Sequence, residues 1–374
     1  MPSAFDRIHR APLGFGPAPS PRQGPDGSRF TSWSDARTTT IGVVLEVDRD
    51  SIDALLPEGY SVDPSTVHPT ILLEVMELRN LPWLAGRGYN TFGIYLNDVV
   101  CNRVAPPIKA SYLAVLFENF TDPITTGREE LGFPKVFAEI PDPVITYKDD
   151  GKSGDEDKRI HTVSWDGYEF LRLELSNLAC RPSESSPALC PAQQLYTHPT
   201  KNGILHQRYI PSVGEPGKAD ANYATFCPPA PSRPTVLQFK TLDSTMTDVA
   251  NTVCPAVMQS MVETTAQGVS EFCHGAAKVE IRKGSFEQLP TLHNIVDRLA
   301  ALKFSVCHQI AVQEFKGASD LGELPECVKI DNREITTFDH SLSLLSHYSL
   351  FLSVSHSYVH AIRCTTANNH RIEM

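Results

Sequence analysis

The stretch that decides the fold is Gly127-Arg128-Glu129-Glu130-Leu131-Gly132-Phe133-Pro134-Lys135-Val136-Phe137-Ala138-Glu139-Ile140. It opens with turn chemistry at its first glycine, and a strand is predicted from Phe133 onward. Side chains alternate along a strand, so Phe133, Lys135 and Phe137 fall on one face. Lysine is rarely buried unless it is paired. Lys135 is therefore either a surface lysine on an edge strand or a buried amine with a functional role.

The order of residue types in this stretch resembles a known active-site segment. In the acetoacetate decarboxylase family, Gly-Arg-Glu is followed by a short spacer and then by aromatic-Pro-Lys, as in residues 127–135 here. The resemblance implies that Lys135 forms a Schiff base with a β-keto acid. The family's second lysine is replaced by Val136. A residue at this position points to the opposite face, so burial alone is expected to keep the Lys135 amine largely neutral near pH 7.

A glutamate near the reaction centre is predicted on the strand at residues 71–78. Glu74 is the one acid among apolar side chains on its face of that strand. The segment Leu73-Glu74-Val75-Met76 resembles the family strand whose glutamate faces the reaction cavity, which implies a catalytic Glu74. The alternative is a structural glutamate paired with an arginine.

Two family positions are not matched by this sequence. The family has a second active-site glutamate shortly after a tyrosine, but Tyr89-Asn90-Thr91-Phe92 contains no acid. That role is vacant, or it is filled by an amide or a hydroxyl. A substrate-holding arginine of the family corresponds to Glu46, an anion that would repel a substrate carboxylate, so this role is not transferred.

Further substrate contacts are expected from the motif itself. Arg128 and Glu129 match the family's motif, and together with Phe133 they are candidates to bind the substrate. The alternative for Arg128 and Glu129 is a salt bridge that fixes the loop before the strand. His206 lies in a segment that resembles a late family strand, and it is either a proton donor or a structural histidine.

The composition narrows the possible function classes. The 374 residues carry a formal net charge of −11, which argues against nucleic acid as a main partner. Neither a secretory signal nor a transmembrane run of about 18 apolar residues is present, so a cytoplasmic protein with no membrane partner is expected. The nine cysteines contain no Cys-x-x-Cys pair, which predicts free thiols and no metal site.

The order of predicted elements indicates a strand-rich fold. Strands predominate between residues 39 and 211, and Asp166-Gly167 marks a hairpin. By resemblance, the fold is α+β, a mostly antiparallel β-barrel with flanking helices, and the protein is expected to be a homo-oligomer. The expected divisions are an irregular arm (1–36), an acetoacetate decarboxylase-like domain (37–316) with an insertion at about 228–277, and a C-terminal tail of unknown role (317–374).

The chemistry implied by the resemblance is that of a carboxy-lyase. The Lys135 amine attacks the carbonyl group of a β-keto acid, the iminium accepts the electrons released as CO2 leaves, and hydrolysis frees a ketone. Glu74 would transfer a proton or orient water. The imine is the electron sink, so no cofactor is needed. Two alternatives remain open: a Schiff-base aldolase or dehydratase acting on an oxo acid, and a non-catalytic binding module of the same fold.

Overall fold

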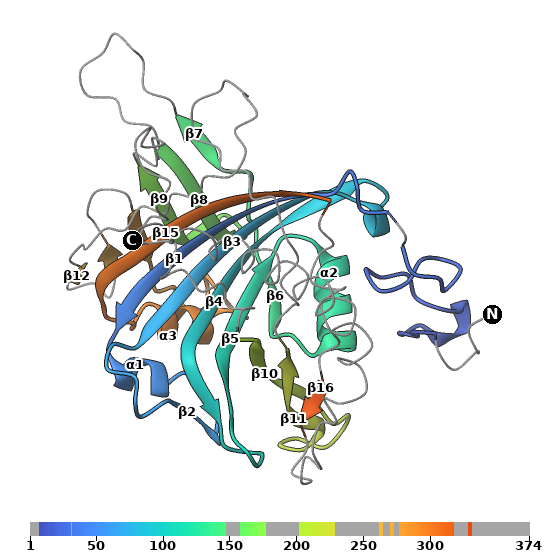
Figure 1. The fold of residues 1–374 in the computed structure, drawn as a ribbon, viewed down its shortest axis with the longest axis horizontal. Coiled ribbons are helices and arrows are strands. Elements are labelled where there is room, and N and C mark those ends of the chain that lie inside the picture. The colour runs from blue at the N-terminus through green and yellow to red at the C-terminus, as the bar shows by residue number, and fades with distance from the viewer. Residues whose placement is uncertain are drawn as a thin grey trace, which may run out of the picture.

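The computed structural model describes residues 7–30, 32–146, 158–176, 202–228, 262–264, 270–272, 277–317 and 328–330. Within these ranges the chain is built mainly of strands, which form two sheets, and the helices are few and short (Figure 1). The predicted strand-rich character is therefore confirmed.

The large sheet contains β1 (Arg37–Val47), β2 (Tyr60–Val62), β3 (Thr70–Leu81), β4 (Arg87–Cys101), β5 (Ile108–Glu118), β6 (Lys135–Phe137), β10 (Ile204–Pro211), β11 (Ala219–Cys227), β15 (Phe304–Lys316) and β16 (Val328–Ile330). Its order is β15-β1-β3-β4-β5-β10-β11-β16, with β2 paired to β4 and β6 paired to β5. Its pairs are antiparallel except that β6 and β10 both run parallel to β5. A parallel neighbour requires a crossover connection, and the helical segment between β5 and β6 supplies one.

The smaller sheet has the order β12 (Val262–Thr264), β13 (Ser270–Phe272), β14 (Ala277–Ile281), β9 (Tyr168–Ser176), β8 (Lys158–Trp165) and β7 (Val144–Thr146). β8 and β9 form the predicted hairpin. Its turn residues Asp166 and Gly167 both have positive φ, of 47° and 77°. A tight hairpin turn with two positive φ values matches the right-handed twist of the strands, so the local turn chemistry explains this pairing.

The helical elements are α1 (Arg49–Asp53), α2 (Thr121–Thr126), α3 (His293–Leu299), the 3-10 turns η1 (Leu13–Phe15) and η2 (Pro82–Leu84), and the π-helical turn η3 (Gly127–Leu131). The predicted stripe of apolar residues at helical spacing accounts for α3, whose Val296 and Leu299 are buried. α1 begins at an N-cap, where the Asp48 side chain accepts from the amide of Ser51.

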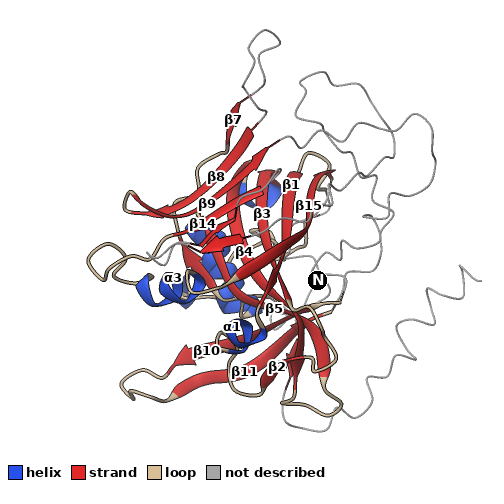
Figure 2. Ribbon diagram, turned by 90° about the vertical axis from the view of Figure 1, so that its left-hand side faces the viewer, coloured by secondary structure: helices blue, strands red, loops and turns tan. Residues whose placement is uncertain are grey.

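The large sheet carries apolar side chains on both faces, and the faces have different partners. One face packs on the smaller sheet and α3, forming the main core around Ile41, Phe92 and Phe117 (Figure 2). The opposite face is called the site face below. Side chains alternate along each strand, so the same strands supply both faces. The site face carries a separate apolar cluster made of Leu72, Tyr95, Leu113, Leu116, Phe133, Ile204 and Cys227.

The closed barrel implied by the resemblance is not confirmed. The described strands form two open sheets, and the larger one mixes parallel with antiparallel pairs. β16 belongs to the segment expected to be a tail and pairs with β11. The rest of that tail, and most of the expected insertion, lie outside the described residues.

Two further sequence predictions concern membranes and cysteines. Among the described residues, no helix has the length and apolar character needed to cross a membrane. Cys101 and Cys307 are buried free thiols, as predicted, whereas Cys227 is disulfide-bonded, so the prediction of free thiols is wrong at that position.

Candidate active site

Lys135 is the first residue of β6 and points onto the site face. In the parallel ladder it lies opposite Leu116, a member of the site-face cluster. Its side chain is 7% exposed, and its Nζ lies 2.9 Å from Oε1 of Glu118 and donates to the Pro123 carbonyl oxygen at 3.0 Å. The ring centroid of Phe133 lies 5.8 Å from the same nitrogen. Lys135 is therefore a buried, paired amine and not a surface lysine.

The connection between β5 and β6 creates this arrangement. α2 continues into the π-helical turn η3, which ends at Gly132 with a φ of 76°. Single π turns recur at functional sites, and glycine adopts positive φ readily. The amide of Phe133 donates to the carbonyl of Gly127 at 3.1 Å, so the chain turns back. The strand therefore begins at Lys135, later than predicted, and Phe137 is 44% exposed, so the expected apolar face is incomplete.

Val136 points to the other side of β6. It packs on the main core, whereas Lys135 faces Leu116 on the site face. This agrees with the expected alternation: a lysine in place of Val136 would project away from the Lys135 amine. The second part of that expectation considers burial alone and leaves out Glu118, whose Oε1 lies 2.9 Å from the amine.

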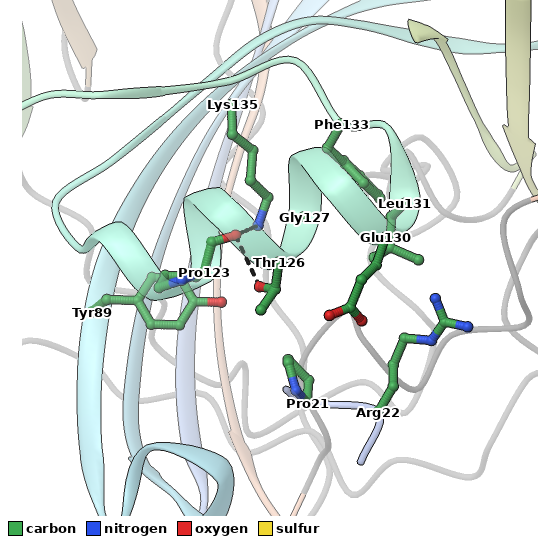
Figure 3. Close-up of a pocket in the computed structure, with 10 residues that line it drawn as sticks. All are labelled: Pro21, Arg22, Tyr89, Pro123, Thr126, Gly127, Glu130, Leu131, Phe133 and Lys135. Carbon is green, nitrogen blue, oxygen red and sulfur yellow. Dashed lines mark hydrogen bonds between the residues drawn. The ribbon is translucent and has the colours of Figure 1, made fainter. Parts of the chain in front are cut away.

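A small pocket, with a cavity volume of about 20 Å³, lies beside the Lys135 amine. Figure 3 shows the Lys135 amine, the Glu130 carboxylate and the Thr126 hydroxyl around it. Its walls come from β4, α2, η3, β6 and the N-terminal arm, defined here as residues 7–30. The lining residues are Pro21, Arg22, Tyr89, Pro123, Thr126, Gly127, Glu130, Leu131, Phe133 and Lys135.

The N-terminal arm has an irregular backbone apart from η1, and it forms part of the pocket. The Gln23 amide bonds to the carbonyls of Ile8 and Ala18, which closes the arm into a loop. Arg10 Nε lies 3.2 Å from Glu130 Oε1, and their side chains are 14% and 4% exposed. Burial raises the pKa of the Glu130 carboxyl, and Arg10 offsets this only in part. The arm is thus docked on the candidate site through a nearly buried ion pair.

Arg10→Ala is expected to release the arm. Removing one partner of a buried ion pair leaves the other charge uncompensated, which costs about 3 kcal/mol. We expect faster proteolytic cleavage within residues 8–24 and a lower melting temperature. His9→Ala, which changes an exposed side chain of the same arm, is the control. Equal cleavage rates in the two variants would show that the ion pair does not hold the arm.

The two motif residues expected to bind substrate do not line the pocket. Arg128 and Glu129 are exposed, and Arg128 Nη1 donates to the backbone carbonyl of Lys135 at 2.8 Å. This bond fixes the loop, in line with the structural alternative for Arg128. Glu130 lines the pocket instead, because a residue three positions along a helical turn shares the side of Gly127.

The model of the family described as acetoacetate decarboxylase (ADC) matches residues 11–228, more than half of the chain. The chain belongs to the acetoacetate decarboxylase family. A search of curated proteins finds no match. The predicted resemblance is therefore confirmed, and the family match includes Lys135 and its pocket.

The solved structures similar to this chain include an acetoacetate decarboxylase and an acetoacetate decarboxylase-like enzyme. Acetoacetate decarboxylase from Legionella pneumophila is 15% identical, with 79% of this chain and 87% of that chain covered and a TM-score of 0.41. An acetoacetate decarboxylase-like enzyme from Sphingomonas wittichii RW1 is 12% identical, with 82% and 97% covered and a TM-score of 0.43. The enduracididine biosynthesis enzyme MppR complexed with pyruvate is 14% identical, with 79% and 93% covered and a TM-score of 0.39. At these TM-scores the family assignment rests on the sequence match alone.

Glu74, the acid suggested by the acetoacetate decarboxylase resemblance, lies on the site face but outside the Lys135 pocket. The register runs from Glu74 through Gly93 and Leu116 to Lys135, so β4 and β5 separate the two side chains. The backbones are roughly 14 Å apart at about 4.8 Å per strand. Glu74 is buried and accepts from the Tyr95 hydroxyl at 3.0 Å. A role in proton transfer would therefore need a substrate or a water chain that spans this distance.

Thr91 is the hydroxyl residue of the segment in which the resemblance implies a second acid. Thr91 lies on the site face directly opposite Glu118 in the β4–β5 ladder. Asn90 faces the other way and donates to the Ile140 carbonyl and the Asp142 carboxylate. Of the amide and the hydroxyl, the hydroxyl is the one that lies on the site face. Sequence reasoning missed Glu118, although an acid that ends a strand buried on both faces is a signal that could have identified it.

Glu46 takes no part in the pocket. It accepts hydrogen bonds from His68 Nδ1 at 3.2 Å and His308 Nε2 at 2.8 Å. Burial raises the pKa of its carboxyl, but the two histidines outweigh burial and leave the pKa below its usual value. Glu46 is thus an anion held by two histidines, and it cannot take the place of the family's substrate-holding arginine.

His206 contacts two of the residues that line the pocket. It is fully buried, and its ring stacks on that of Phe133 with centroids 4.5 Å apart. Nε2 donates to the Leu131 carbonyl at 2.9 Å, since a carbonyl can only accept. Burial lowers the pKa of His206 to about 4. His206 is therefore neutral near pH 7, and it positions two pocket-lining residues, Phe133 and Leu131. This agrees with a structural histidine and not with a proton donor.

The buried His206 predicts a loss of stability in acid. The unfolded chain binds a proton below the ordinary pKa of 6.5, whereas the folded state resists it down to about 4. The free energy of unfolding is thus unaffected by His206 above pH 6.5 and decreases as the pH falls from 6.5 to about 4. The decrease is about 2 kcal/mol at pH 5. His206→Gln has no titrating group at this position. Between pH 7 and pH 5 its free energy of unfolding, measured with urea, should therefore fall by about 2 kcal/mol less than that of the wild type. Equal losses in both proteins would contradict the assignment.

Proposed function

We propose that this protein is a carboxy-lyase that decarboxylates a β-keto acid through an imine on Lys135. The observation that carries the proposal is the buried Lys135 amine, which lines a small pocket and contacts a carboxylate. Lysine is rarely buried without a partner, and buried ionisable groups in pockets concentrate at functional sites. Membership of the acetoacetate decarboxylase family supports an enzyme of this kind.

The proposed reaction uses the amine as a nucleophile and then as an electron sink. The neutral amine of Lys135 attacks the β-carbonyl carbon, and loss of water yields an iminium. The electrons of the bond to the carboxylate move toward the iminium nitrogen, CO2 leaves and an enamine remains. Protonation at carbon and hydrolysis release the ketone and restore Lys135. The imine supplies the electron sink, so the proposal includes no metal or organic cofactor.

The lining of the pocket favours a small substrate. Tyr89, Leu131 and Phe133 provide apolar walls, and Glu130 and Arg22 place charges on the side of the arm. The arm contributes to the pocket, so a substrate enters either past it or when it moves. The cavity volume is about 20 Å³, enough for about one water molecule, so even a short β-keto acid requires the arm or the lining side chains to move.

A Schiff-base aldolase or dehydratase acting on an oxo acid is the second candidate. Thr91 favours it, because a hydroxyl stands where the family resemblance places an acid. Proton transfers after imine formation would then differ from those of a decarboxylase. Both candidates share the imine on Lys135 and differ in the bond that breaks next.

Trapping and product analysis test the proposal together. The protein is incubated with a panel of β-keto acids and 2-oxo acids in the presence of sodium borohydride, and labelled peptides are identified by mass spectrometry. We expect a reduced adduct on Lys135 and release of CO2 from carboxyl-labelled substrate. An adduct without CO2 favours the second candidate. An adduct on another lysine refutes the role of Lys135. If no acid of the panel gives an adduct, a non-catalytic binding module takes the place of both candidates.

A further inference from the structure

The residue that contacts the Lys135 amine most closely is Glu118, and neither the motif nor the family resemblance pointed to it. Glu118 is the last residue of β5, two positions beyond Leu116, which lies opposite Lys135. The Glu118 and Lys135 side chains are 1% and 7% exposed, and Oε1 lies 2.9 Å from Nζ. Adjacent parallel strands fix both backbones, so the contact follows from the sheet and not from two flexible surface chains.

This geometry suits direct proton transfer. A candidate general base must lie within about 2.6–3.2 Å of the atom whose proton it takes, and Glu118 meets this requirement without a bridging water. The Pro123 carbonyl holds a second N–H of the amine at 3.0 Å. A carbonyl oxygen cannot carry the proton away at neutral pH, whereas a carboxylate can. Of the two contacts, only Glu118 is able to change the charge of Lys135.

We propose that Glu118 is the acid–base residue that turns Lys135 into a nucleophile and carries its protons through imine formation. This role rests on the proposed function. Glu118 takes a proton from the ammonium group, and the neutral Nζ then attacks the substrate carbonyl carbon. The carbonyl oxygen receives that proton and becomes a hydroxyl group.

The remaining protons can be followed through the same carboxyl group. Glu118 removes a second proton from the attached nitrogen, which leaves a neutral carbinolamine. It then returns this proton to the hydroxyl group, and the C–O bond breaks to release water. The nitrogen lone pair forms the C=N bond, so an ammonium and a ketone have become an iminium and water. Glu118 is again a carboxylate beside a positive charge, as it was at the start.

Thr91 offers an independent way to test the position of this acid. It lies directly opposite Glu118 on the antiparallel neighbour β4, and both side chains point onto the site face. The Thr91 hydroxyl is buried and has no hydrogen-bond partner among the described residues. Directly opposed residues have Cβ atoms about 5 Å apart. A glutamate at position 91 is therefore placed to reach the same amine from the other strand.

The experiment measures imine formation on Lys135 without requiring decarboxylation. Acetone and cyanoborohydride convert the imine into a stable isopropyl adduct, and its rate of formation is followed by mass spectrometry from pH 6 to pH 9. We expect Glu118→Gln to label Lys135 about a hundredfold more slowly at pH 7, the lower range for loss of an acid–base group. A purely structural glutamate would alter the melting temperature without changing the pH profile. Glu287→Gln, which changes an exposed carboxylate that does not line the pocket, is the matched control and should label like the wild type.

Two further variants secure the interpretation. Glu118→Asp keeps the negative charge but withdraws the carboxylate, so it should fold even where Glu118→Gln does not, and it should label more slowly than the wild type. The exchange Thr91→Glu with Glu118→Thr should recover at least a tenth of the wild-type rate. If Glu118→Gln labels Lys135 at the wild-type rate, the proposed role of Glu118 is wrong, but the imine on Lys135 is not. If Glu118→Gln does not fold, a wild-type labelling rate in Glu118→Asp has the same meaning. Absence of any Lys135 adduct in the wild-type protein, with acetone and with every keto acid, would overturn both proposals.

Discussion

Lys135→Arg is expected to abolish turnover while leaving the fold intact. A guanidinium stays protonated and cannot form an imine, but its charge still pairs with the Glu118 carboxylate that contacts the native amine at 2.9 Å. Loss of the covalent route should lower kcat/KM by at least about a thousandfold, because enzymes commonly accelerate reactions by a millionfold or more. CO2 release measures turnover, and circular dichroism with thermal unfolding checks the fold.

The matched control for this substitution is Lys109→Arg. The Lys109 side chain is 44% exposed and pairs with Asp63 and Asp98, each at 3.0 Å. Exposed ion pairs contribute little, so kcat/KM should stay within about twofold of the wild type. If Lys135→Arg keeps a tenth or more of the activity, Lys135 is not the nucleophile. If the arginine does not fit, Lys135→Gln is the smaller replacement that also cannot form an imine.

Gly127→Ala is expected to displace the Lys135 side chain and lower kcat/KM strongly. A methyl group at Gly127 would lie 2.3 Å from Cε, 2.6 Å from Cδ and 2.7 Å from Nζ of Lys135, well inside normal contact distances. The lysine must therefore move away from its contacts with Glu118 and Pro123. A shift of about 1 Å in a reacting group costs on the order of a hundredfold in rate. Steady-state kinetics and the rate of borohydride trapping both measure this effect.

The backbone at Gly127 does not account for such a loss. Its φ is −66°, which alanine adopts without strain, and alanine is favoured over glycine in a helix by about 1 kcal/mol. A loss in Gly127→Ala thus reports the contact with Lys135. Thr125→Ala is the control on the same helix, because Thr125 does not line the pocket. Full activity in Gly127→Ala would mean that the working position of the amine differs from the one described.

The sequence alone determined the features that depend on neighbouring residues. The order Gly-Arg-Glu, spacer, Phe-Pro-Lys identified the family and Lys135, and the match over residues 11–228 confirmed the family. The turn at Asp166-Gly167 and the stripe of α3 followed from turn chemistry and helical spacing. Alternation along a strand correctly predicted that position 136 points away from the amine.

Only the tertiary structure decided which groups surround that amine. Glu118 reaches Lys135 because β6 pairs in parallel with β5, and Glu130 reaches the pocket because η3 is a π-helical turn where a loop was expected. Pro21 and Arg22 arrive from an arm far away in the sequence. Local periodicity shows which side a residue faces within its own strand, but it does not determine which strands pair or in what register. The charges around Lys135, and with them its chemistry, are set by those long-range pairings.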